Sequence, residues 1–187
     1  MGYIFDPQIL QQTARDAIAL RLPVDRMVAT LATELGRRYP GHISLPSAWI
    51  LNNAGGAMGA MYLLHASLTE YLMIFGTPLG TEGHTGRFLV DDYFIVLAGE
   101  QWAFSAGAFD REVYRPGEMH HLARGQAKQY KMPEMCWALE YARGPIVTMM
   151  PFGLADTLTS TLDYRTLAQL IWVYAKSAVR ELSRGKV

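Results

Sequence analysis

Between residues 46 and 145 the sequence consists of short apolar segments that alternate with glycine and proline turns. The segments are rich in aliphatic and aromatic side chains and cover residues 49–52, 60–65, 67–75, 87–98, 100–104, 112–114, 120–122, 126–130 and 136–142. The turns between them include residues 55–56, 76–78, 80–86, 116–117 and 132–133. This spacing is typical of an antiparallel sandwich or a small barrel.

Helical periodicity precedes this middle region. Residues 6–38 predict two helices with a break at Leu22 and Pro23, because proline does not continue a helix. Asp6 is the expected N-cap, and Pro7 occupies the first helical position, where its missing N–H is not needed. These helices form an arm that packs on, or tethers, the strands that follow.

Helical periodicity returns after residue 151. Residues 152–158 predict a short helix, and Asp163 is the expected cap of a longer helix that is apolar around more than half of its girth. Basic residues collect towards its end, where they could contact lipid headgroups if the helix lies in a membrane interface. Alternatively, the helix packs between the strands and an oligomer partner. The pattern as a whole predicts an α+β fold in one domain, with a helical arm (1–45), an antiparallel sandwich or barrel (46–150) and C-terminal helices (151–187).

The charge composition limits the possible partners. Lys and Arg together number 17, as do Asp and Glu, so no net field attracts nucleic acid and we exclude such a partner. Only 18% of the residues are charged, which indicates surface hidden by a partner, an oligomer or a membrane. The single cysteine, Cys136, excludes an internal disulfide and a multi-cysteine metal site. We expect no membrane-spanning helix and no signal peptide.

One carboxylate, Glu140, interrupts an otherwise apolar segment. Strand alternation places Trp137, Leu139 and Tyr141 on one face, and Glu140 between two alanines on the other. The small neighbours leave space beside Glu140, and desolvation raises the pKa of a buried carboxyl towards the range of acid catalysis at neutral pH. Glu140 is therefore either an acid or the structural partner of a cation such as Arg143.

Further carboxylates interrupt other strands. Asp91 and Asp92 are adjacent, so alternation sends them to opposite faces and at most one of them shares the interior with Glu140. If the two carboxyls meet, charge repulsion keeps one proton on the pair, which then offers both an acid and a base. Glu70 and Tyr71 also lie on opposite faces, where the alternatives to catalysis are a hairpin ion pair and a packed tyrosine.

The histidines do not form a metal-binding pattern. Cupin-type barrels bind metal through a His-x-His pair with a downstream glutamate, whereas His120 and His121 are adjacent and point to opposite faces of a strand. We therefore expect no metal site. The glycine-rich stretches at 53–59 and 80–86 match neither the P-loop nor the dinucleotide fingerprint, and tight turns account for them.

Ordered blocks along nearly the whole chain resemble the family of the fungal sterol C-8 isomerases, whose animal relative is the sigma-1 receptor. The blocks read YIFDP (3–7), NNAGGAMG (52–59), HASLTEYL (65–72), FGT (75–77), GTEGHTG (80–86), DDYF (91–94), YRPG (114–117), KQY (128–130), WALE (137–140) and LADTLTSTLD (154–163). So many blocks in one order make the match more specific than any single motif.

The resemblance implies a cupin-like antiparallel β-barrel without a metal or other cofactor, flanked by helices and assembled as a homotrimer. In the receptor, the glutamate that matches Glu140 meets the basic amine of ligands, near an aspartate that matches Asp91 or Asp92 and a tyrosine that matches Tyr71. The spacing after that aspartate differs between the two branches, so both positions remain alternatives. Family members carry a membrane helix ahead of the block at 3–7, where this sequence begins, and we expect docking on a membrane surface through the C-terminal helices.

The chemistry of such an isomerase suits these residues. Moving a sterol double bond from C8=C9 to C7=C8 requires a proton at C9, a carbocation at C8 and loss of a proton from C7. A desolvated carboxyl can supply the proton, and a carboxylate stabilises the cation. We expect catalysis by Glu140 with Asp91 or Asp92, supported by His65 and Glu70. The expected substrate-binding side chains are Tyr71, Trp137, His121, Phe88, Phe94, Trp49 and Met58.

Two functions remain open from the sequence. The first is an isomerase that acts on a sterol or a similar polycyclic alkene. The alternative is a non-catalytic, sigma-1-receptor-like protein that uses Glu140 to bind sterols or amphiphilic amines. In either case we expect a peripheral membrane protein, on the endoplasmic reticulum of a eukaryote or the cytoplasmic membrane face of a bacterium, that binds cationic amphiphilic amine inhibitors.

Overall fold

The computed structural model describes residues 2–45 and 47–186. The N-terminal arm consists of helices α1 (Pro7–Ala19) and α2 (Val24–Arg38). As predicted, Pro7 begins α1 and Asp6 caps it, because its carboxylate accepts hydrogen bonds from the N–H groups of Gln8 and Ile9 at 2.8 and 3.2 Å. The predicted break between the helices is also confirmed, with Pro23 as the residue before α2.

The strands of the described residues form two antiparallel sheets, and the closed barrel that we expected is not present. The six-stranded sheet has the order β1-β2-β3-β10-β5-β8, and the four-stranded sheet has the order β4-β9-β6-β7. The strands of the smaller sheet are three or four residues long and pair with one another, so the ladder does not continue around a barrel. The strand bounds are β1 Trp49–Ala54, β2 Ala57–Ala66, β3 Glu70–Thr77, β4 Thr81–His84, β5 Asp91–Ala98, β6 Gln101–Phe104, β7 Glu112–Tyr114, β8 Met119–Leu122, β9 Gln129–Met132 and β10 Cys136–Arg143.

A helical region follows β10. It consists of a 3-10 turn (Ile146–Met149), helix α3 (Met150–Asp156), a π-helical turn (Thr157–Thr161) and helix α4 (Tyr164–Ser183). The short helix therefore begins before residue 152, where we placed its start. The cap prediction for α4 is confirmed, since the Asp163 carboxylate accepts a hydrogen bond of 3.1 Å from the N–H of Thr166.

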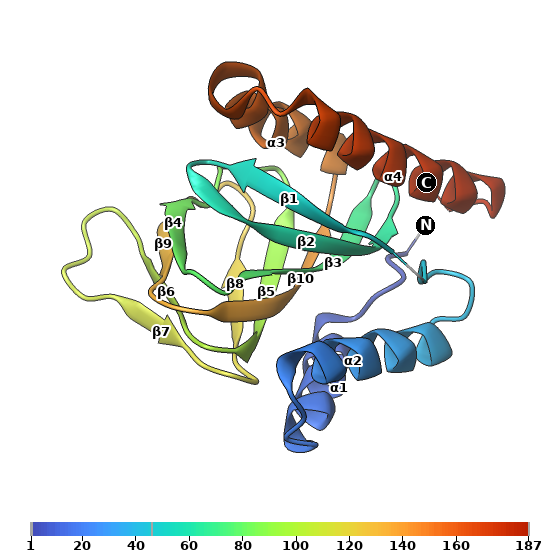
Figure 1. The fold of residues 1–187 in the computed structure, drawn as a ribbon, viewed down its shortest axis with the longest axis horizontal. Helices are drawn as coiled ribbons and strands as arrows, with labels where there is room; N and C mark the ends of the chain where they lie inside the picture. The colour runs from blue at the N-terminus through green and yellow to red at the C-terminus, as the bar shows by residue number, and fades with distance from the viewer. Residues whose placement is uncertain (1, 46, 187) are drawn as a thin grey trace.

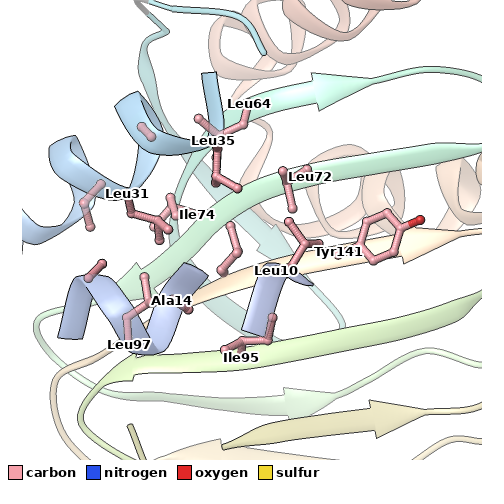
Figure 2. Close-up of a cluster of buried hydrophobic side chains, with 14 of the residues drawn as sticks. Leu10, Ala14, Leu31, Leu35, Leu64, Leu72, Ile74, Ile95, Leu97 and Tyr141 are labelled. Atoms are coloured by element: carbon pink, nitrogen blue, oxygen red, sulfur yellow. The ribbon is translucent and has the colours of Figure 1, made fainter. Parts of the chain in front are cut away.

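The two helical regions cover opposite sides of the strands (Figure 1). On the arm side, residues of α1 and α2 form an apolar cluster with one face of the six-stranded sheet. Figure 2 shows Leu10 and Leu31 of the arm next to the sheet residues Ile74 and Ile95. A second apolar cluster on the other face of the sheet packs against residues of α3 and α4. The six-stranded sheet is therefore buried on both faces, and each face has its own neighbours.

Strand alternation decides which face a residue joins. On β10, Leu139 and Tyr141 belong to the cluster on the arm side, whereas Ala138 and Ala142 belong to the other cluster. All four are fully buried. The face that carries the alanines also carries Glu140 and borders the site described next.

Candidate active site

A cavity of about 370 Å³ lies on the inner side of the six-stranded sheet. Strands of both sheets contribute to its wall, and residues of the 3-10 turn, α3 and α4 close it. Most of the wall is apolar, with side chains that include Met61, Met73, Phe75, Phe88, Phe94, Leu122, Ile146, Phe152 and Leu170. Its volume falls within the range of about 300–1,000 Å³ that is usual for small-molecule sites.

Glu140 lies in this wall, between Ala138 and Ala142 on β10. The ladders place Glu140 opposite Met73 on β3 and opposite Phe94 on β5, and both of those side chains also line the cavity. The carboxylate is thus surrounded by apolar side chains from three neighbouring strands. Burial raises the pKa of Glu140 to about 7.

Tyr71 holds the Glu140 carboxylate directly. Its phenol donates a hydrogen bond of 2.5 Å to Oε1 of Glu140. This bond favours the charged carboxylate and opposes part of the rise in the pKa of Glu140 that burial causes. Burial, followed by the negative charge of Glu140, raises the pKa of the Tyr71 phenol well above its ordinary value, so Tyr71 stays protonated and remains a donor.

Asp92 is the second carboxylate of the cavity wall. On β5 it lies two residues from Phe94, which is directly opposite Glu140, so both carboxylates are on the same face of neighbouring strands. Burial, and then the negative charge of Glu140, raises the pKa of Asp92 well above its ordinary range. Asp92 Oδ1 is buried and has no hydrogen-bond partner in the described residues. Near neutral pH these two carboxyls therefore favour a state that retains a proton.

The structure separates Asp91 from this pair. Asp91 Oδ2 accepts a hydrogen bond of 3.2 Å from Arg124, and Asp91 Oδ1 lies 3.4 Å from Nε2 of His121. His121 stacks on Tyr93, whose side chain belongs to the cluster on the arm side of the sheet. Of the two adjacent aspartates, the one brought to Glu140 is Asp92.

His65 and Glu70, which we expected to support catalysis, lie away from the cavity. His65 is buried against Phe5, at 5.0 Å between ring centroids, and its Nδ1 pairs with the backbone oxygen of His42 at 2.9 Å. The Glu70 carboxylate accepts hydrogen bonds from the N–H of Ile4 at 2.7 Å and from the Tyr141 phenol at 2.8 Å. Both side chains face the arm, and their predicted roles remain untested.

The expected substrate-binding residues divide in the same way. Phe88 and Phe94 line the cavity, as Tyr71 does. Trp49 and Met58 have exposed fractions of 46% and 49%, and neither belongs to the described cavity wall. Trp137 packs on Trp49, at 5.2 Å between ring centroids, on the face opposite to Glu140. Together with His121, these residues do not lie beside the Glu140–Asp92 pair.

Several polar side chains of the wall were not among our predictions. Tyr130 and Tyr174 line the cavity, and burial followed by the charge of Glu140 raises the pKa of each phenol. His120 and Gln101 line it as well. Alternation places His120 and His121 on opposite faces, so it could have indicated His120 as a candidate for the cavity wall. It does not show which strands meet at the cavity, because strand pairing joins segments that are distant in the sequence.

A separate cluster joins the loop after α2, strand β2 and the end of α4, and its ligand atoms are close enough together to bind a metal ion. Among the described residues, His42, His65 and Glu181 offer ligand atoms within 4.8 Å of one another. Arg180 and Arg184 already lie 3.3 and 3.7 Å from Oε1 of Glu181. Two guanidinium groups on the only carboxylate suit an ion-pair network better than a cation site.

Large apolar side chains are exposed on α4. Trp172 and Val179 have exposed fractions of 69% and 64%, and Ile171, which is 47% exposed, also lines the cavity. Within residues 2–45 and 47–186, no helix combines the length and the apolar character needed to cross a bilayer.

Comparison with solved structures gives only partial overlaps. The cupin domain of Schizosaccharomyces pombe Cnp3 is 15% identical and overlaps 57% of this chain and 76% of that chain, with a TM-score of 0.43. A predicted oxalate decarboxylase from Thermotoga maritima is 13% identical and overlaps 55% of this chain and 97% of that chain, with a TM-score of 0.44.

Sequence comparison gives much longer matches. The C-8 sterol isomerase erg2 of Aspergillus fumigatus is 53% identical over 98% of this chain and 78% of its own length. The C-8 sterol isomerase of Pyricularia oryzae is 52% identical over 98% of this chain and 85% of its own length. The Sigma non-opioid intracellular receptor 1 of Gallus gallus is 37% identical over 97% of this chain and 82% of its own length. A family model described as "ERG2 and Sigma1 receptor like protein" matches residues 1–186, and the chain belongs to that family.

Proposed function

We propose that this protein is a sterol C-8 isomerase that moves a ring double bond from C8=C9 to C7=C8 without a cofactor. The observation that carries the proposal is the pair formed by Glu140 and Asp92 in the wall of an apolar cavity. Relatives of about 50% identity that bear the name C-8 sterol isomerase support the same reaction.

The pair can supply both proton transfers. In the state with one proton, Asp92 holds it, because the charge of Glu140 favours protonated Asp92 while the Tyr71 phenol favours charged Glu140. Asp92 gives its proton to C9, and the bonding electrons of C8=C9 form the new C9–H bond and leave a cation at C8. The Glu140 carboxylate takes the proton from C7, and the electrons of that C–H bond form C7=C8. Transfer of the proton from Glu140 to Asp92 restores the starting state.

The cavity wall favours the charged intermediate. Apolar side chains such as Phe88 and Phe94 exclude water, which would otherwise trap a carbocation. In this low-dielectric surrounding, the charge of Glu140 stabilises a cation more strongly than it would in water. General acid and base catalysis of this kind typically contributes a factor of about 100 to 10,000.

Conversion of zymosterol or fecosterol by the purified protein in detergent tests the reaction. We expect the C7=C8 product by chromatography and mass spectrometry, and in D2O we expect deuterium at C9 in those turnovers before which the carboxyl proton has exchanged with solvent. Glu140→Gln removes the base and should abolish both signals. Unchanged turnover in Glu140→Gln would contradict the assignment.

The alternative, a sigma-1-receptor-like binding protein, has its support in the 37% identity with the receptor of Gallus gallus. A protonated amphiphilic amine in the cavity would pair with the Glu140 carboxylate as the carbocation does. Amine binding that disappears in Glu140→Gln, without product from any C8=C9 sterol, would support a binding protein. Amine binding together with turnover would identify such amines as inhibitors of the enzyme.

We also propose that the protein lies on a membrane surface, which in a eukaryote is the surface of the endoplasmic reticulum. We further propose that it forms a homotrimer in which each chain is a single domain. The exposed Ile171, Trp172 and Val179 on α4 support surface docking, since they offer apolar contact to lipid. Flotation with phosphatidylcholine vesicles tests this, and we expect Trp172→Ser to reduce the bound fraction. Analytical ultracentrifugation in detergent tests the trimer.

A further inference from the structure

His120 carries a buried lone pair in the cavity wall that the proposed reaction does not use. The residue is 3% exposed and borders the cavity, and its Nε2 lacks a hydrogen-bond partner in the described part of the chain. Buried polar atoms without a partner are rare, because an atom removed from water without a new partner loses its hydrogen bonds and gains none in return. A ligand group that donates a hydrogen bond would remove that cost.

Gln101 decides which nitrogen of His120 is free. Oε1 of Gln101 lies 3.0 Å from Nδ1 of His120. A carbonyl oxygen can only accept, so Nδ1 carries the hydrogen and Nε2 is left as an acceptor. The ring is held in this orientation by stacking on Tyr114, at 4.5 Å between centroids.

The register places His120 in line with the reacting pair. Glu140 on β10 is opposite Phe94 on β5, and Phe94 is opposite His120 on β8. Neighbouring strands lie about 4.8 Å apart, so the backbones of Glu140 and His120 are about 10 Å from each other across one face of the sheet. A rigid ring system held at one end by His120 can therefore present its other rings to the carboxyl pair.

We propose that Nε2 of His120 accepts a hydrogen bond from the hydroxyl group of the sterol substrate and so fixes which ring carbons reach Glu140 and Asp92. This inference rests on the proposed function and adds the recognition of the alcohol end of the substrate. His120 is a substrate-binding residue in this arrangement, and Gln101 is a positioning residue that acts through it.

A neutral acceptor fits the surroundings of His120 better than a catalytic base does. Burial, with the positive charge of Lys128 as the next cause, lowers the pKa of His120 to about 4. The Lys128 ammonium is 2.6 Å from the Glu112 carboxylate, which in turn accepts a hydrogen bond from Tyr114. Protonation would place a second cation beside Lys128, whereas accepting a hydrogen bond leaves the imidazole neutral.

Two substrates and two variants test the proposal. The substrates are a C8=C9 sterol and its 3-deoxy analogue, in which hydrogen replaces the hydroxyl group. We expect the wild type to prefer the sterol by about 10- to 100-fold in kcat/KM, because the analogue leaves Nε2 unpaired. His120→Phe retains the aromatic stacking on Tyr114 but has no acceptor, and it should turn over both substrates at similar rates.

The neighbouring residue provides the matched control. His121→Phe alters a side chain outside the cavity and should keep the wild-type preference. Gln101→Met should lower the preference in part, since it releases Nδ1. Binding of an amphiphilic amine without a hydroxyl group shows whether His120→Phe is folded. If His120→Phe does not fold, His120→Gln takes its place, and this variant should keep part of the preference because its amide can accept a hydrogen bond.

The outcomes separate this inference from the proposed function. Turnover by the wild type with an unchanged preference in His120→Phe would overturn the role of His120 and leave the isomerase intact. An equal loss on both substrates in that variant would also overturn it, because the histidine would then act on the chemical step. Absence of turnover of either substrate by the wild type would instead refute the isomerase assignment.

Discussion

The phenol of Tyr71 lies 2.5 Å from Oε1 of Glu140, and it donates a hydrogen bond to a carboxylate whose pKa burial raises to about 7. Because this bond favours the charged carboxylate, it opposes the effect of burial. The protonation state of the candidate base at neutral pH therefore depends on one hydroxyl group.

Tyr71→Phe removes that hydroxyl group and should raise the pKa of Glu140. If catalysis needs charged Glu140, the rising limb of the pH profile of kcat/KM moves to higher pH, and kcat/KM at pH 7 falls by about tenfold. The pH profile with a C8=C9 sterol measures this. Tyr174→Phe is the control, since Tyr174 lines the same cavity. An unmoved limb in Tyr71→Phe would contradict the role of the hydrogen bond.

We expect substitution of the two adjacent aspartates, Asp91 and Asp92, to have very different effects on kcat. Asp92→Asn removes the proposed acid from the cavity and should lower kcat by about 100- to 10,000-fold. Asp91→Asn alters a side chain paired with Arg124 on the opposite face and should retain nearly wild-type kcat. Steady-state kinetics of the two variants under identical conditions decide the matter, and the reverse order of effects would exclude Asp92 as the acid.

Glu140 should also make stability depend on pH. Its pKa is raised from 4.5 to about 7 in the folded state, so between these values the folded protein holds a proton that the unfolded chain has lost. The folded state then binds more protons, and the free energy of unfolding falls as pH rises through this window, by on the order of 3 kcal/mol.

Glu140→Gln lacks this titration and should gain stability over the wild type as pH rises from 4.5 to about 7. Urea denaturation of both proteins across this range measures the difference. A difference that stays constant with pH would show that the carboxyl is not desolvated.

Glu70 should matter for folding rather than for chemistry. Its buried carboxylate pairs with Lys186 at 2.7 Å and accepts hydrogen bonds from the backbone of the N-terminal segment. Glu70→Gln leaves Lys186 without its counter-charge and should lower the free energy of unfolding by about 3–5 kcal/mol.

Kinetics of the folded Glu70→Gln protein should remain near wild type, as thermal denaturation and turnover assays can show together. Glu82→Gln is the matched control, because Glu82 pairs with Lys131 on the surface and should affect stability little. Lost turnover with unchanged stability in Glu70→Gln would instead support the catalytic role that the sequence suggested.

Local patterns predicted much of the fold because they depend on near neighbours in the chain. The caps at Asp6 and Asp163 need only a carboxylate before a helical segment. The alternation around Glu140 likewise separates it from Leu139 and Tyr141 without knowledge of any other strand. The closed barrel was wrong because closure depends on which strands pair, and that is settled by contacts between distant segments.

His65 shows why the face of a residue can escape sequence analysis. Leu63 pairs with Met73 on the cavity side, and alternation would place His65 on the same side. A bulge shifts the register between Leu63 and His65, so that His65 pairs with Leu72 on the arm side. Asp91 and Asp92 posed a similar difficulty, since only the ladder with β10 decides which of them joins Glu140.

The two faces of β10 also bear on how such a chain can evolve. One set of alternate residues, Leu139 and Tyr141, packs in the cluster on the arm side, while Glu140 lines the cavity on the face that it shares with Ala138 and Ala142. Substitutions on the cavity face can change which ligands the cavity accepts, while the residues of β10 that pack against the arm remain unchanged. A lineage built in this way can give rise to both catalysts and receptors from one scaffold.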